Sequence, residues 1–178
     1  MIRRCVLILG LLWPGIVLAN DWDALDREGA FVIMRHALAP GTGDPAGFDL
    51  DDCATQRNLS AAGRDQARAI GDAFRARGQR FDVVLTSQWC RCRDTARLLD
   101  LAPVRAAPPF NSFFGGRGDA AAQGRAALEL LRGLEGRPLV VTHQVNITDL
   151  TGVFPRSGEV VVVRLAEGGL EVLGRIRP

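Results

Sequence analysis

The chain contains no lysine and no tyrosine, and only two of its 178 residues are histidines. All 22 basic residues are therefore arginines, and 20 acidic residues nearly balance them, which leaves a net charge of +2. A nucleic-acid-binding protein normally has a clear basic excess, so this balance argues against that class of protein. Because histidine is so scarce, the positions of His36 and His143 are informative about function.

Long apolar runs are also missing. The apolar stretch within residues 1–19 is interrupted by Pro14 and is shorter than the roughly 20 residues of a membrane-spanning helix. Arg3 and Arg4 precede this stretch and Ala19 ends it, which is typical of a secretory signal peptide. We expect cleavage after Ala19 and export to a bacterial periplasm, with a buried first strand or helix as the alternative. Cleavage removes two arginines and no acidic residue, so the net charge becomes zero.

The remaining residues, 20–178, show no internal repeat or linker and are numerous enough for one domain with a hydrophobic core. Short apolar runs predict buried strands at residues 31–34, 81–87 and 138–143, and a closing hairpin at residues 158–165 and 169–176. Helical spacing predicts helices at residues 58–78, 90–99 and around 128–134. This alternation predicts an α/β three-layer sandwich, with a mainly parallel central sheet flanked by helices.

Three cysteines lie beyond the predicted signal peptide: Cys53, Cys90 and Cys92. An oxidising compartment permits a disulfide. Cys90 and Cys92 are too close in sequence to pair comfortably, so we expect Cys53 to pair with one of them and one thiol to remain. Metal binding is the competing interpretation, but this spacing is a weak signal for zinc.

Both histidines follow predicted strands. Arg35 and His36 end the first strand, Ser87 ends the second and His143 the third. In a parallel sheet, ligands bind at the carboxyl ends of the strands. A neutral imidazole can act as a nucleophile, base or ligand, and arginine can hold a phosphate or carboxylate through two parallel hydrogen bonds. The pattern indicates an oxyanion substrate that is attacked by an imidazole.

Other nucleophiles fit the sequence less well. A cysteine phosphatase needs an arginine six positions after its cysteine, but those positions hold Leu59, Ala96 and Leu98. Neither a Gly-x-Ser-x-Gly elbow nor a phosphate-binding loop that ends in Gly-Lys is present. A zinc hydrolase would need both histidines and a carboxylate, and this alternative stays open through Asp44, Asp51 and Asp52.

Four sequence blocks carry a resemblance to a known family. Arg35-His36 is followed by Ala37, where the family's Arg-His-Gly signature has glycine. The other blocks are residues 58–71 (NLSAAGRDQARAIG), 87–96 (SQWCRCRDTA) and 140–147 (VVTHQVNI). In this order they resemble the histidine phosphatase superfamily, which also contains phosphoglycerate mutases and acid phosphatases. The resemblance spans most of residues 20–178 and implies a phosphoglycerate mutase-like fold.

The resemblance also implies roles for individual side chains. His36 would attack phosphorus and form a phosphohistidine, from which water would release phosphate. Arg35, Arg91 and His143 would hold the non-bridging oxygens and neutralise the charge that develops during transfer. Ser87 would bond the phosphate or a neighbouring arginine, unless it only caps the end of its strand. The resemblance implies no metal and no other cofactor.

The general acid is not assigned by the resemblance. Family members use a glutamate after the second arginine or an aspartate after the second histidine, but here Gln144 follows His143. Residues 108–119 (PPFNSFFGGRGD) contain no glutamate, and their aromatic residues are expected to pack as a lid or a substrate wall. The nearest carboxylate is Asp119, and the loop of residues 40–58 offers Asp44, Asp51 and Asp52. A substrate whose leaving group needs little protonation is the alternative.

The sequence therefore predicts a periplasmic phosphatase of small phosphomonoesters that needs no metal. In its overall organisation it resembles exported phosphatases of lipopolysaccharide-core heptose phosphate. Other sugar phosphates and a phosphorylated protein are alternative substrates. A rival hypothesis is a binding module that keeps the phosphate pocket without turnover, and the missing acid and Ala37 favour it. The sequence makes no prediction of the oligomeric state.

We predict that the mature protein begins near Asn20, because small residues precede this position. Amino-terminal sequencing of protein from a periplasmic fraction should start there. Recovery of intact protein that begins with Met1 from the cytoplasm would contradict both the cleavage and the location.

Overall fold

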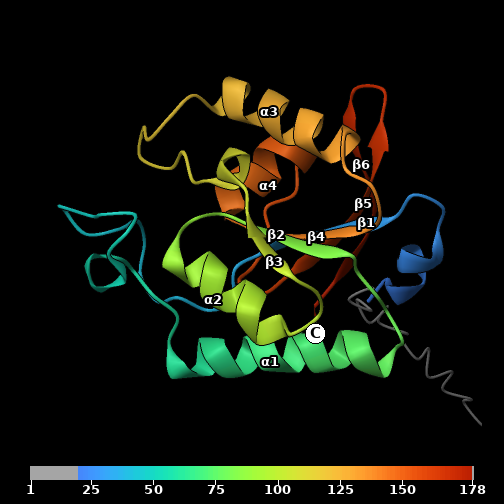
Figure 1. The fold of residues 1–178 in the computed structure, drawn as a ribbon, viewed down its shortest axis with the longest axis horizontal. Coiled ribbons are helices and arrows are strands. Elements are labelled where there is room, and N and C mark those ends of the chain that lie inside the picture. The colour runs from blue at the N-terminus through green and yellow to red at the C-terminus, as the bar shows by residue number, and fades with distance from the viewer. Residues whose placement is uncertain (1–19, 178) are drawn as a thin grey trace, which may run out of the picture.

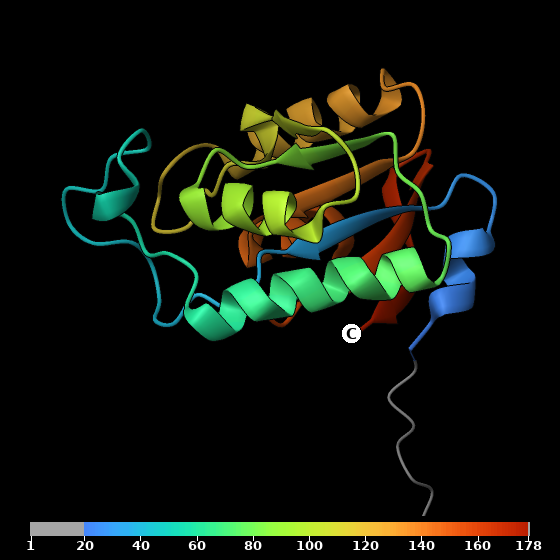
Figure 2. The ribbon, with the colours of Figure 1, turned by 60° about the horizontal axis from the view of Figure 1, so that its bottom comes forward.

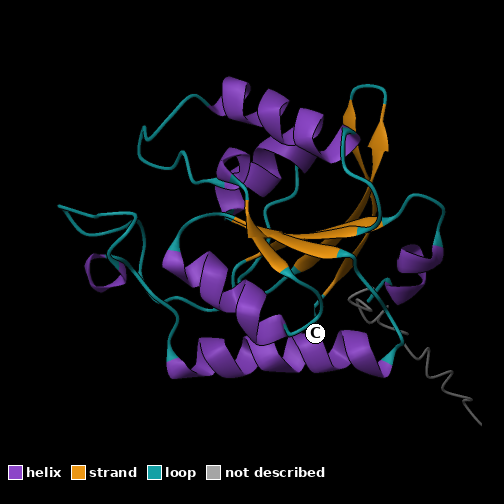
Figure 3. Cartoon of the chain, viewed as in Figure 1, coloured by secondary structure: helices purple, strands orange, loops and turns teal. Residues whose placement is uncertain are grey.

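A six-stranded sheet lies between two pairs of helices in the computed structural model, which describes residues 20–177 (Figures 1 and 3). The predicted signal peptide lies outside the described residues. The strands are β1 (Phe31–Arg35), β2 (Val83–Thr86), β3 (Val104–Ala106), β4 (Pro138–Thr142), β5 (Val160–Ala166) and β6 (Gly169–Ile176). Their order is β3-β2-β4-β1-β5-β6; the first four are parallel, and β5 and β6 add an antiparallel edge.

The helices cover the two faces of the sheet in pairs. Helices α1 (Ala61–Ala76) and α2 (Cys90–Leu99) lie on one face, and α3 (Ala120–Arg132) and α4 (Gln144–Thr151) on the other (Figure 1). Short 3₁₀ helices span Trp22–Asp26, Cys53–Thr55 and Pro108–Phe110. The three-layer α/β sandwich expected from the sequence is confirmed. Within residues 20–177, no helix is long and apolar enough to cross a membrane.

The core follows from the alternation of side chains along the central strands. In β1, Val32 and Met34 pack toward α1 and α2, whereas Phe31 and Ile33 pack toward α3 and α4. Successive side chains of β4 and β5 also point to opposite faces, so the sheet contributes residues to two apolar layers. Full burial of each such side chain stabilises the fold by about 1.5–3 kcal/mol. This two-sided burial explains why these strands have continuous apolar sequences.

Helix α1 holds the chain just after β1. Ser60 caps the helix, because its Oγ accepts a hydrogen bond from the Gly63 N–H at 3.0 Å. A Cβ on Gly63 would lie 2.0 Å from the carbonyl oxygen of Leu38, so only glycine permits this approach. The Leu38 N–H also donates to Oε1 of Gln66 at 2.9 Å. The serine, glycine and glutamine of this sequence block therefore fix the backbone two residues after His36.

A disulfide joins Cys53 to Cys90, with their Cα atoms 5.7 Å apart. The expected pairing of Cys53 with one cysteine of the Cys-x-Cys stretch is thus confirmed. The bond links the loop of residues 40–58 to the first residue of α2, directly before Arg91. This loop projects beyond the carboxyl end of β1 (Figure 2). Cys92 is a free thiol and is buried.

We expect protein that starts at Asn20 to show one reactive thiol when it is denatured without reductant, and three after reduction. Closure of a loop with a sequence separation of 37 residues contributes about 3–4 kcal/mol to the free energy of unfolding. Thiol counting checks the bond, and denaturant unfolding with and without reductant measures the contribution. Three reactive thiols in unreduced protein would exclude the disulfide.

Candidate active site

The strands that end in the two histidines are neighbours. Strand β4 lies between β1 and β2, and the His36 N–H donates to the carbonyl oxygen of Thr142, one residue before His143, at 2.9 Å. A cavity of about 90 Å³ opens at this edge of the sheet. Its charged and imidazole side chains are Arg35, His36, Asp44, Arg57, Arg91 and His143. The structure therefore brings together Arg35, His36, Arg91 and His143, four of the residues to which the sequence assigned phosphate chemistry.

The His36 ring is held in one tautomer. Its Nδ1 lies 2.7 Å from the carbonyl oxygen of Ala37. Because a carbonyl oxygen only accepts, Nδ1 carries the hydrogen and Nε2 keeps its lone pair. The side chain is buried, and desolvation together with the charge of Arg91 lowers its pKa well below the ordinary value. His36 therefore presents a neutral nitrogen nucleophile.

Ala37 fits the position where the family signature has glycine. The residue is fully buried, and its N–H donates to Oγ1 of Thr95 at 3.0 Å. Its φ is not positive, so the backbone does not require glycine here. The replacement consequently gives no physical reason for loss of activity.

His143 contacts polar atoms at both ring nitrogens. Its Nε2 lies 2.8 Å from Oγ of Ser87, and its Nδ1 lies 3.4 Å from an Nη of Arg91. Because guanidinium only donates, this geometry leaves the hydrogen on Nε2, from which it is donated to Ser87. Ser87 in turn donates to Asn111 Oδ1 at 3.3 Å. Desolvation first, and then the charge of Arg91, lower the pKa of His143 well below its ordinary value.

The free cysteine beside His143 is not a nucleophile. Its sulfur lies 3.5 Å from Nε2 of the histidine, but burial raises the pKa of the Cys92 thiol to about 12. A thiol that stays protonated at neutral pH neither attacks phosphorus nor binds a metal. Within residues 20–177, no three His, Cys, Asp or Glu side chains lie together as a metal site.

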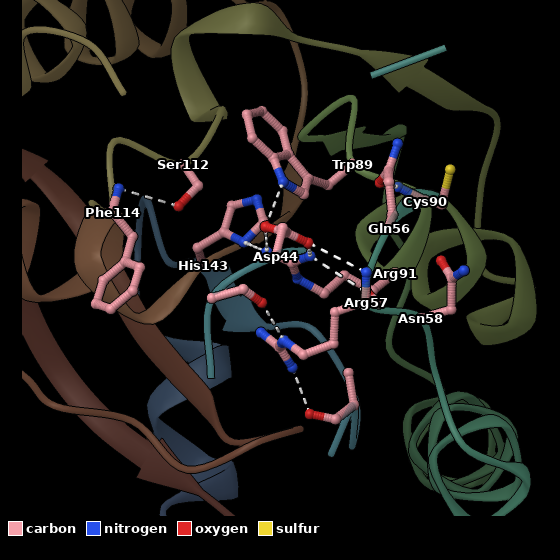
Figure 4. A network of polar contacts seen from close by, with 12 residues as sticks. Asp44, Gln56, Arg57, Asn58, Trp89, Cys90, Arg91, Ser112, Phe114 and His143 are labelled. Atoms are coloured by element: carbon pink, nitrogen blue, oxygen red, sulfur yellow. Dashed lines mark hydrogen bonds and ion pairs between the residues drawn. The ribbon is translucent and has the colours of Figure 1, made fainter. Parts of the chain in front are cut away.

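Arg91 forms a two-point ion pair with Asp44. Its Nη1 lies 2.6 Å from Oδ1, its Nη2 lies 3.2 Å from Oδ2, and both side chains are 3% exposed (Figure 4). The carboxylate also accepts from the Trp89 indole N–H at 3.1 Å and from the Arg57 backbone N–H at 3.2 Å. Desolvation alone would raise the pKa of Asp44, but hydrogen bonding and charge from Arg91 outweigh it and lower the pKa.

Two more arginines make the cavity electropositive. Arg35 donates to the carbonyl oxygen of Pro155 at 3.1 Å, and Arg57 donates from Nε to Gly43 at 2.7 Å and from Nη1 to Ala39. Desolvation and then the charge of Arg91 lower the pKa of both guanidinium groups. With neutral histidines, three guanidinium groups face one carboxylate, so the cavity carries two uncompensated positive charges. This excess suits a dianionic ligand.

A family model described as the Histidine phosphatase superfamily (branch 1) matches residues 32–119. The matched segment contains Arg35 and His36, the α1 motif and the block with Arg91. The chain belongs to the histidine phosphatase superfamily. Membership of this superfamily supports a phosphatase activity, and His143 lies beyond the matched segment but in the same cavity.

Solved structures share the fold of this superfamily member, whereas no curated protein matched the chain. The protein histidine phosphatase SixA, solved with tungstate, is 20% identical with a TM-score of 0.59, over 84% of this chain and 97% of that one. The protein TTHB049 from Thermus thermophilus is 20% identical with a TM-score of 0.60, over 84% and 99%. A phosphoserine phosphatase from Entamoeba histolytica, in complex with 3-phosphoglyceric acid, is 12% identical with a TM-score of 0.57, over 84% and 97%. The expected phosphoglycerate mutase-like fold is confirmed.

Two predicted site residues lie outside the cavity of this histidine phosphatase. Ser87 is fully buried and contacts His143 and Asn111, so its placement does not support the expected phosphate contact and makes it an orienting group. Asp119 is exposed and caps α3, with Oδ1 accepting from the Ala122 N–H at 3.0 Å. Asp119, the carboxylate of residues 108–119, therefore caps a helix and does not line the phosphate cavity.

The loop of residues 40–58 supplies two cavity residues whose roles the sequence left open or missed. Asp44 was one of three candidate loop carboxylates, and it alone lines the cavity. Arg57 was not predicted, although it directly precedes the α1 motif. The expected wall from residues 110–114 is present, since Ser112 and Phe114 line the cavity. Trp89 is buried in the core and also packs edge-on against His143.

We predict that neither histidine of the folded protein titrates near pH 6.5. Both folded pKa values are lowered, so below about pH 6.5 the unfolded chain binds more protons than the folded chain. The free energy of unfolding should therefore fall by about 1.4 kcal/mol per histidine for each pH unit below 6.5, until the folded pKa is reached. Above pH 6.5 the histidines contribute no pH dependence.

NMR of the imidazole C–H signals between pH 8 and 5 checks this in protein without a histidine tag. The same signals in urea are the control and should titrate normally. A folded-state midpoint near 6.5 for either histidine would contradict the prediction.

Proposed function

We propose that this histidine phosphatase is exported and hydrolyses small phosphomonoesters through a phosphohistidine at His36. The observation that carries the proposal is the hydrogen bond from His36 Nδ1 to Ala37, which leaves Nε2 as a neutral nucleophile in a cavity lined by three arginines. A nucleophile and a set of oxyanion donors are the two parts that phosphoryl transfer requires.

Transfer begins when the phosphate group enters between the arginines. Arg35, Arg57 and Arg91 donate hydrogen bonds to its non-bridging oxygens and neutralise their charge. Within the described residues, the buried Nε atoms of Arg35 and Arg91 lack an acceptor, and a phosphate with several oxygens supplies one. His36 Nε2 then attacks phosphorus, and water later releases phosphate from the phosphohistidine.

His143 donates to a phosphate oxygen only if Nδ1 gains a proton. The arginines oppose this protonation in the free protein, whereas a bound dianion favours it. Ser87 fixes the ring from the opposite side through Nε2. His143 therefore changes its charge with the ligand, and Ser87 keeps its orientation.

The proposed substrate class follows from the cavity and the compartment. A cavity of about 90 Å³ suits a phosphate group, while the remainder of the substrate lies at the rim near the half-exposed Phe114. The Cys53–Cys90 disulfide supports export, and a sugar phosphate of the cell envelope, such as lipopolysaccharide-core heptose phosphate, fits that location. Because SixA is described as a protein histidine phosphatase, phosphohistidine peptide belongs in the same substrate panel.

We expect His36→Ala to abolish turnover of p-nitrophenyl phosphate and of a sugar phosphate panel, and to retain phosphate binding. Arg91→Ala should lower kcat by about 10²–10³-fold and weaken phosphate binding as well, because this charge acts before and during transfer. Wild-type protein quenched with ³²P-labelled substrate should carry label that survives alkali and is lost in acid. His36→Ala should carry none.

Arg97→Ala is the matched control, because Arg97 is exposed on the same helix and does not line the cavity. Its kinetics should equal those of wild type, and EDTA should leave wild-type activity intact. Near wild-type turnover by His36→Ala would exclude the phosphohistidine mechanism. Phosphate binding without turnover in wild type would instead favour the binding-module hypothesis.

A further inference from the structure

Asp44 occupies both Nη atoms of Arg91, the end of the guanidinium group that can also hold two oxygens of a phosphate group. A planar carboxylate on both Nη atoms of a guanidinium has the same hydrogen-bond geometry as a bound phosphate. The pair is almost fully buried, so water screens its charges little. Substrate phosphate and Asp44 are therefore two anions that compete for one cation.

Asp44 is also the sole carboxylate that lines the cavity within residues 20–177. The other two loop candidates lie outside it: Asp52 caps the 3₁₀ helix of Cys53–Thr55, and Asp51 is exposed. Gln144 stands after the second histidine, where it cannot release a proton. Among the described residues, Asp44 is therefore the one cavity residue whose carboxyl group can give a proton to the leaving oxygen.

Two features of this carboxylate change when phosphate takes its place on Arg91. It loses the two hydrogen bonds that favour its charged form, and it gains a dianion as a neighbour. Both changes favour protonation. Its remaining donors, the indole of Trp89 and the backbone N–H of Arg57, still hold it at the cavity wall. The charged and titratable groups around it are Arg91 from α2, Arg57 from its own loop, Arg35 and His36 from the end of β1, and His143 from the end of β4.

We propose that Asp44 is the catalytic proton donor to the leaving group, and that the phosphate group of the substrate displaces it from Arg91 for that step. This inference rests on the proposed phosphohistidine function and adds the acid that the sequence left unassigned. The resting ion pair keeps Asp44 charged until substrate arrives, and binding of the substrate converts it to the acid.

The protons and bonds balance over two steps. Displaced Asp44 takes a proton from the monoanionic substrate or from solvent. The bond from His36 Nε2 to phosphorus forms, the bond from phosphorus to the leaving oxygen breaks, and Asp44 gives that oxygen its proton. The carboxylate then takes a proton from water as the water oxygen bonds to phosphorus. The bond to His36 breaks, its electron pair returns to Nε2, and the proton on Asp44 is released when Arg91 binds the carboxylate again.

The first test compares two leaving groups in Asp44→Asn. A good leaving group such as p-nitrophenolate needs little protonation, whereas the alkoxide of glycerol phosphate needs a full proton. We expect kcat/KM to fall by about 10²–10⁴-fold for glycerol phosphate, and to change little for p-nitrophenyl phosphate. The alkaline limb of the wild-type pH–rate profile for glycerol phosphate should disappear in the variant.

Asp51→Asn is the matched control, because it removes a carboxylate from the same loop without touching the cavity. It should leave both rates unchanged. Equal losses for both esters in Asp44→Asn would mean that Asp44 only positions Arg91. Faster turnover of both esters would mean that it only competes with substrate. Either result overturns the proposal.

The second test follows the anion exchange without turnover. Sulfate stays a dianion between pH 6 and 8, so any proton taken up when it binds comes to the protein. Calorimetry of sulfate binding in buffers with different ionisation enthalpies should show proton uptake by wild type, and a clearly smaller uptake by Asp44→Asn. Equal uptake by the two proteins, or no sulfate binding to wild type, would overturn the proposal. If wild type hydrolyses neither ester, the proposed function fails, and the sulfate experiment still decides whether phosphate-like anions protonate Asp44.

Discussion

The parallel pairing of β1 with β4 is the constraint on which the site depends. In this pairing Arg35 lies beside Thr142, so the next residue of each strand is a histidine. The two imidazole rings consequently lie 5.6 Å apart, centroid to centroid, with edge-to-face geometry. A shift by one residue would turn every apolar side chain of β1 to the wrong helix layer. The same burial that stabilises the sheet therefore fixes the distance between the catalytic groups.

The same edge of the sheet concentrates positive charge, which is unfavourable without a bound anion. Desolvation, and then the charge of Arg91, lower the pKa of Arg35, Arg57 and both histidines, and one carboxylate offsets only part of the positive charge. Carbonyl oxygens of the loop and of Pro155 supply further acceptors for Arg35 and Arg57. The cavity is therefore preorganised for an anion. Backbone carbonyl oxygens at the loop accept hydrogen bonds from Arg57 and stabilise its charge. Such preorganisation is what favours developing charge in phosphoryl transfer.

Patterns that act over short sequence distances predicted most of the fold and the four central site residues. Short apolar runs marked β1, β4 and the hairpin of β5 and β6, and helical spacing marked α1 and α2. The short edge strand β3 was not predicted, because its three residues are exposed and show no apolar pattern. Both arginines and both histidines could be found because each of them lies in a local pattern at the end of a strand or the start of a helix.

The remaining site residues depend on contacts between distant parts of the chain. Asp44 meets Arg91 across 47 residues, and no local pattern distinguishes it from Asp51. Asp119 was favoured for its place in the sequence, yet its oxygen caps α3. Likewise, Cys90 and Cys92 are two positions apart on a helix and point about 200° apart around its axis. Only the orientation of α2 therefore decides which of them meets Cys53.

The disulfide has a topological consequence for the chain itself. Residues 53–90 form a covalently closed ring that contains α1 and β2, together with Arg57 and the capping Ser60. A protease that cuts one peptide bond inside this ring leaves two fragments that are still joined through sulfur. Asp44 stays attached on one side of the ring and Arg91 on the other, so a single cut cannot separate the two halves of the anion site.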